Sequence, residues 1–217
     1  MIEQSIETDK NALNRLGTAI VMVTFLCGTI ASFFFFSWTS FSTNSIIWFI
    51  PNCYGVGVGY HRLFTHGSFE TTIWVKRSMV VAGCLALQGS FLRWIAVHRL
   101  HHMYTDKDGD PHSPLHGAWW AQWFWMLLPN PAIKADVIEE HASDLAKDDF
   151  YQFMSKYWWL PSITLNILMF CTGWYFSGWQ LGVSLVLGYM AQVFIGWQIT
   201  WSVNSVTHMK KFGYRTF

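Results

Sequence analysis

Two long stretches of the sequence contain no charged residue and no histidine, and they constrain the fold more than any other feature. They cover residues 17–60 and 157–207. A membrane-spanning helix needs about 20 consecutive apolar residues, so each stretch is long enough to cross a bilayer twice. Polar turn-forming residues lie near the middle of each stretch, at Thr39–Ser45 and at Ser177–Gln180. The sequence therefore predicts two transmembrane helical hairpins.

The position of the charges predicts an orientation. A hairpin returns the chain to the side it left, so residues 1–15, 61–156 and 208–217, which carry all the charges, share one side of the membrane. The positive-inside rule makes that side cytoplasmic. We expect one integral, multi-pass membrane domain over residues 1–217. Its parts are hairpin one at 17–60, a cytosolic cap segment at 61–156 and hairpin two at 157–207.

The composition supports a membrane protein and excludes some partners. Apolar residues make up 52% of the chain and charged residues only 12%, against roughly 25% charged in an ordinary soluble domain. The alternative is a soluble protein with two buried core hairpins, but soluble helices rarely lack a polar face over such lengths. The net charge is +1 and no basic run occurs, so the sequence does not indicate a nucleic-acid partner.

Histidines gather where the predicted hairpins meet the cytosolic side. His61 and His66 directly follow hairpin one, and His208 follows hairpin two, one helical turn after Asn204. A third group lies in the cytosolic segment, within the sequence His98-Arg-Leu-His101-His102. The topology thus places all three groups at one membrane face. That agreement between charge pattern and histidine pattern favours a shared site.

The spacing of these histidines favours a metal site. His98, His101 and His102 share one face of a helix. His61 and His66 are five residues apart, which separates them by about 140° on an ideal α-helix, so they can bind one site only if the helix ends or distorts between them. Imidazole suits iron, copper and zinc. The remaining histidines are expected to be surface groups: His112, His116 and His141.

Three segments together resemble one known family. The sequences GYHRLFTH, HRLHHMYTDKDGDPHSP and TWSVNSVTHMKKFGYR are similar to those of the membrane-bound, stearoyl-type delta-9 fatty acid desaturases, and the resemblance covers nearly the whole chain. It implies an all-α membrane protein with four transmembrane helices under a cytosolic helical cap that carries a histidine-rich diiron site. The implied activity is dioxygen-dependent insertion of a cis double bond into a saturated acyl chain.

The resemblance also implies roles for individual residues. Asn204 matches a residue that reaches an iron through water. Gln88, Trp94 and Thr200 match residues that shape the kink in the acyl tunnel. The matches to iron ligands are His61, His66, His98, His101, His102 and His208. No catalytic residue beyond the metal ligands is implied.

The sequence departs from the family pattern in two places. Family members carry a third box, H-N-x-H-H, after the NSxxH segment, and this chain stops at Phe217 without one. We therefore expect a fragment of a longer protein with an incomplete diiron site. Animal acyl-CoA desaturases have an Arg-Asp pair where this chain has Ala96 and Val97, which favours an acyl-lipid over an acyl-CoA substrate. The two electrons are expected from a donor such as ferredoxin or cytochrome b5.

Several alternatives remain open at this point. A membrane hydroxylase of the same superfamily would share the histidine boxes, and a non-enzymatic membrane protein could use them for zinc. Asp106, Asp108, Asp110 and His112 follow the second box and are placed to orient metal-bound imidazoles, as carboxylates commonly do. The same residues also read as a solvated acidic turn.

Overall fold

The computed structural model describes the backbone of residues 2–208 and the side chains of residues 13–208. Residues 209–217, which include the end of the third quoted motif, lie outside the described residues. All regular elements within 2–208 are helical. They are α1 (Ile2–Phe34), α2 (Trp38–Phe49), η1 (Ile50–Thr65), α3 (Ile73–Cys84), α4 (Phe91–Tyr104), η2 (Pro114–His116), η3 (Trp120–Phe124), α5 (Trp125–Leu127), α6 (Val137–His141), α7 (Asp149–Lys156), α8 (Leu160–Ser177) and α9 (Trp179–Ser205).

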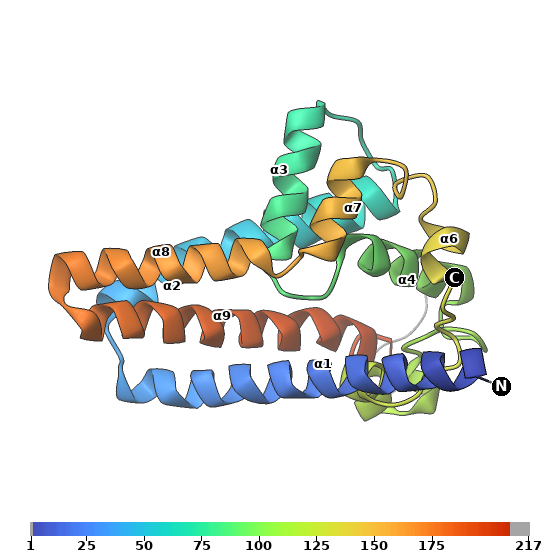
Figure 1. Cartoon of the computed structure of the whole chain (residues 1–217), viewed down its shortest axis with the longest axis horizontal. Coiled ribbons are helices and arrows are strands. Elements are labelled where there is room, and N and C mark those ends of the chain that lie inside the picture. Colours follow the sequence, from blue (N-terminus) through green and yellow to red (C-terminus); the bar gives the residue numbers. More distant parts are fainter. Residues whose placement is uncertain (1, 209–217) are drawn as a thin grey trace.

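The long helices α1, α2, α8 and α9 run side by side along the length of the molecule (Figure 1). The turn between α1 and α2 and the turn between α8 and α9 lie at the same end. The helix α4, which carries the second histidine group, lies toward the other end, where the shorter elements gather (Figure 1). The expected all-helical fold is thus observed, with both turns far from the histidines.

The first turn does not lie where the sequence predicted it. The chain reverses at residues 35–37, and Thr39–Ser45 belongs to helix α2. Two of its polar residues face α9 and are buried: Ser40 Oγ donates to the carbonyl of Ser184 at 2.7 Å, and Asn44 Nδ2 donates to the carbonyl of Leu185 at 3.1 Å. These polar residues therefore join two helices, as small polar side chains do in membrane bundles. The second turn lies where it was expected. The chain reverses there at Gly178, whose φ of 86° is one that glycine adopts readily.

Only part of the expected set of spanning helices is evident. Within the described residues, two helical segments are long and apolar enough to cross a membrane: Leu13–Ser32 and Trp179–Ser205. Helix α8 has 18 residues, but polar and interfacial side chains such as Asn166 and Tyr175 lower its hydropathy. The remaining expected spanning segment consists of α2 followed by η1, and its backbone changes from α-helical to π-helical between them.

An irregular turn between α3 and α4 lies at the centre of the molecule. Its backbone carbonyls are satisfied by aromatic side chains of α9: Tyr189 Oη donates to Leu85 O at 2.6 Å, and Trp197 Nε1 donates to Ala86 O at 2.8 Å. A buried non-helical backbone must find such partners because water is excluded. The turn is therefore fixed to α9, and this brings α4 with its histidines against the end of hairpin two.

Candidate metal centre

The first histidine pair owes its geometry to the unusual winding of η1. This helix is hydrogen-bonded in the π pattern, in which residues five apart are bonded. The amide of His66 accordingly donates to the carbonyl of His61 at 3.1 Å. The two rings then lie on one side of the helix, with their Nε2 atoms 3.1 Å apart. The distortion that the five-residue spacing required is thus present throughout η1.

The second pair comes from α4. His98 and His102 are one turn apart, and their Nε2 atoms are separated by 3.2 Å. The two pairs face each other: the ring centroids of His61 and His98 are 4.9 Å apart, and those of His66 and His102 are 4.4 Å apart. One nitrogen from each of the four rings lies within 4.8 Å of the other three. Two helices therefore present four imidazole nitrogens to one small volume.

The spacing and protonation of these nitrogens suit a metal ion. Two ligands about 2.1 Å from a metal and at right angles to each other are about 3.0 Å apart, close to both observed Nε2 separations. Burial, together with the neighbouring imidazoles, lowers the pKa of His98 to about 2 and that of His102 to about 4. Neutral imidazoles keep the lone pair that a metal needs. The donor set, nitrogen without thiolate, is compatible with iron.

A buried carboxylate orients His101. Asp110 Oδ1 accepts a hydrogen bond from His101 Nδ1 at 2.9 Å and another from the His112 amide at 3.1 Å, while Oδ2 accepts from the Asp106 amide at 2.9 Å. Burial would raise the pKa of Asp110, but the bond from His101 and the nearby amide lower it, and the net shift is downward. Since Nδ1 of His101 donates, its Nε2 lone pair is free for a metal, an arrangement common around metal-bound histidines.

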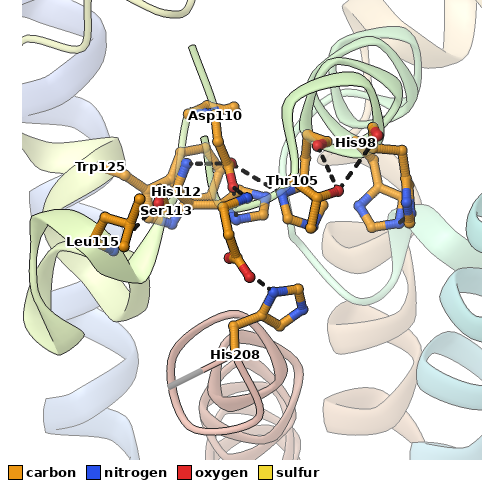
Figure 2. A network of polar contacts seen from close by, with 12 residues as sticks. His98, Thr105, Asp110, His112, Ser113, Leu115, Trp125 and His208 are labelled. Carbon is orange, nitrogen blue, oxygen red and sulfur yellow. Dashed lines mark hydrogen bonds and ion pairs between the residues drawn. The ribbon is translucent and has the colours of Figure 1, made fainter. Parts of the chain in front are cut away.

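His112 differs from the expectation of a surface group. It is 3% exposed (Figure 2). Its ring packs against that of His101, tilted by 33°, with a centroid distance of 4.2 Å. Its Nδ1 has no hydrogen-bond partner among the described residues. Burial lowers its pKa to about 3. By contrast, His116 is exposed and His141 is half-buried.

His208 approaches from the end of α9. Its ring centroid lies 5.4 Å from that of His101, and its Nδ1 lies 3.1 Å from Asp106 Oδ1 (Figure 2). Asn204 is half-buried on the last turn of α9, before His208. The end of α9 is fixed to η3 because Ser205 Oγ donates to Gln122 Oε1 at 2.5 Å. The structure thus brings the histidines of all three sequence groups together.

The three residues matched to an acyl tunnel form one hydrogen-bonded chain. Gln88 lies in the central turn, where its Oε1 accepts from Trp94 Nε1 at 3.1 Å and its Nε2 donates to Thr200 Oγ1 at 3.1 Å. Trp94 lies beside the four-histidine cluster formed by His61, His66, His98 and His102, with its ring centroid 4.8 Å from that of His98. Gln88 therefore connects α4 to α9 directly beside the histidines.

The fold and the histidine site together indicate the general class of protein. The chain is all-helical and histidine-rich, its donor set is compatible with a metal site, and two of its helices are compatible with a membrane. Comparison with known proteins gives the family. Residues 53–216 match the model of the fatty acid desaturase family. The chain therefore belongs to that family.

Curated relatives agree with this assignment. The chain is 37% identical over 182 residues to the sn-1 stearoyl-lipid 9-desaturase of Anabaena variabilis, which covers 84% of this chain and 63% of the relative. It is 36% identical to the sn-1 stearoyl-lipid 9-desaturase of Synechocystis sp., over 83% of this chain and 53% of the relative. A third relative is the sn-2 palmitoyl-lipid 9-desaturase of a Nostoc species, at 35% identity over 84% of this chain and 62% of the relative. The chain thus spans between half and two thirds of these relatives' length.

Proposed function

We propose that this chain is the metal-binding, membrane-embedded part of a desaturase that inserts a cis double bond, at the delta-9 position, into a saturated acyl chain. The observation that carries the proposal is the convergence of histidines from three sequence segments beside the Gln88, Trp94 and Thr200 chain. A site that only binds a metal would not require the histidines to lie against the Gln88, Trp94 and Thr200 chain. A desaturase requires both, because it must activate oxygen and hold one C–C bond next to the metals.

The proposed cofactor is a pair of iron ions. Iron supplies the oxygen chemistry that side chains cannot, since an unactivated methylene has no acidic proton and no leaving group. The residues proposed to hold the irons are His61, His66, His98, His101, His102 and His208, with Asn204 acting through water. Asp110 keeps His101 in the orientation and tautomer that binding needs.

The proposed topology keeps four spanning helices: α1, α2 continued by η1, α8 and α9. Support comes from large apolar side chains on their outer surfaces, among them Phe33 at 77% exposed and Ile46 at 71%. Exposed apolar surface of this extent is unfavourable in water and normal against lipid. The histidines then lie at the cytoplasmic face, because the charged segments flank them there.

Gln88 has a proposed role in choosing which bond reacts. All methylenes of an acyl chain are chemically alike, so selection has to come from the position of the chain relative to the metals. Gln88 connects Trp94 on α4 to Thr200 on α9. It therefore fixes the distance between these two helices, which would line the substrate path beside His98. A bend in the substrate path at this point would place one C–C bond at the centre.

The proposed substrate is an acyl group already in a lipid, as the names of the cyanobacterial relatives say of those proteins. The reaction removes two hydrogens from neighbouring carbons and reduces one dioxygen to two waters. Its balance requires two further electrons and two protons. We propose that a reduced electron-transfer protein such as ferredoxin or cytochrome b5 supplies the electrons from the cytoplasmic side.

Product analysis tests this function. The complete native gene is expressed in a host that makes only saturated acyl chains and supplies reduced ferredoxin, and total fatty acids are examined by gas chromatography. We expect a monounsaturated product with native protein and none with His98→Ala, while His116→Ala, an exposed histidine, serves as the control. A hydroxylated product would instead favour the hydroxylase alternative. Absence of any product, with iron bound, would contradict an oxidative role.

A further inference from the structure

Arg99 lies inside the second histidine group but contacts none of its rings through a hydrogen bond within the described residues. Its Nη1 donates to the carbonyl of His141 at 2.9 Å, and its Nη2 donates to the carbonyl of Phe64 at 2.7 Å. The same two nitrogens contact both carboxylate oxygens of Asp144, at 2.7 and 3.0 Å. One guanidinium thus joins α4 to two other segments of the chain.

Both carbonyls belong to helix ends. Phe64 is the next-to-last residue of η1, and His141 is the last residue of α6. Carbonyls in the last turn of a helix have no partner within that helix, and the negative end of the helix dipole attracts a cation there. In η1 the carbonyls of Arg62 and Leu63 bond to the amides of the following residues, Ser68 and Gly67. The carbonyl of Phe64 is bound by Arg99 instead.

The Arg99–Phe64 hydrogen bond joins the two segments that carry the histidine pairs. Phe64 lies between His61 and His66 on η1, and Arg99 lies between His98 and His102 on α4. The Arg99–Phe64 hydrogen bond therefore connects the two backbones that carry the four-histidine cluster. Asp144 accepts both arms of the guanidinium and so fixes the plane in which they point. A lysine has the same charge but no planar fork, so it cannot make these bonds together.

We propose that Arg99 is a positioning residue that fixes the first histidine pair relative to the second. This inference rests on the proposed metal site. It assigns a function to the arginine of the second box that differs from metal binding and from substrate contact. Without the fork, the end of η1 carrying His66 is free to move relative to α4, and the four nitrogens no longer hold the separation that a metal requires.

The first test needs no metal. Hydrogen exchange of the metal-free protein is compared for native, Arg99→Lys, Arg99→Gln and Arg93→Lys, where Arg93 is an exposed arginine of the same helix. We expect faster exchange in both Arg99 variants for peptides covering residues 61–68 and 137–144, with peptides of α9 unchanged. Arg93→Lys should match native protein. Unchanged exchange in the Arg99 variants would overturn the proposal.

The second test measures the metal site with Co²⁺, whose absorption spectrum reports ligand geometry. We expect Arg99→Lys to bind Co²⁺ about tenfold more weakly than native, the lower end of the effect of groups that support metal ligands, with an altered spectrum. Faster exchange together with native Co²⁺ affinity and spectrum would make Arg99 a purely structural residue and overturn its positioning role. Failure of native protein to bind Co²⁺ would instead contradict the proposed metal site, and the positioning role would fall with it.

Discussion

Replacement of Asp110 by asparagine should weaken metal binding without unfolding the protein. The buried carboxylate accepts hydrogen bonds from His101 Nδ1 and from the amides of His112 and Asp106. Asparagine keeps one acceptor oxygen and replaces the other with an NH₂ group. If that oxygen continues to serve His101 and His112, the NH₂ group faces the Asp106 amide, and two donors then oppose each other.

The magnitudes follow from counting these bonds. In Asp110→Asn the half-buried Asp106 amide loses this acceptor, which costs about 1 kcal/mol of folding free energy, the lower end for a donor that loses its hydrogen bond. Loss of the negative charge behind His101 should lower metal affinity about 10- to 100-fold, as is typical when such supporting groups are changed. Asp110→Ala should be more destabilising, by about 3–7 kcal/mol, because His101 Nδ1 and the amides of His112 and Asp106 then all lose this acceptor.

Co²⁺ titration followed by absorption gives the affinity, and thermal unfolding of the metal-free protein in detergent gives the stability. Asp108→Asn is the matched control, since this exposed carboxylate lies in the same turn; it should change neither quantity. Native Co²⁺ affinity in Asp110→Asn, together with lost affinity in His101→Ala, would refute the argument that Asp110 orients His101.

Two further substitutions test the packing and the substrate path. Gly55→Ala should destabilise the protein by about 3 kcal/mol, the upper end for overpacked sites, because its Cβ would overlap the backbone of Gly83; Gly17→Ala, where a Cβ meets nothing within 4 Å, should have little effect on the thermal midpoint. Gln88→Ala should broaden the distribution of double-bond positions while leaving bound metal unchanged, as gas chromatography and metal analysis would show; an unaltered distribution would remove Gln88 from the selection of the reacting bond.

Sequence and structure differ at the first turn for a physical reason. The polar composition of Thr39–Ser45 predicts a turn, yet Ser40 and Asn44 are four residues apart and point to α9 from one face of a helix. Composition alone does not separate a turn from a polar stripe that joins two helices. Gly178 was a better indicator, because its positive φ is a backbone state that most residues avoid.

The histidines were predicted more successfully than their surroundings. Three tight groups at predicted membrane exits predicted one shared site for six of them. In the structure His61, His66, His98 and His102 form one cluster, and His101 and His208 lie next to each other beside it. That all six bind iron stays a prediction. The burial of His112 was missed, because a single histidine in an acidic turn gives no local signal of the aromatic and carboxylate groups that fold over it. The winding of η1 was also not predictable, although the five-residue spacing of His61 and His66 required some distortion.

The winding of η1 also bears on how this gene tolerates the loss of a codon. Deletion of one residue between His61 and His66 would leave them four apart, and relaxation of that turn to an α-helix would keep both rings on one face. The same deletion between His98 and His101 would leave them two apart, on different faces of α4. Over evolutionary time, the first box should therefore drift in length among relatives while the second keeps its spacing, with the helix type of η1 changing along with the number of residues between its histidines.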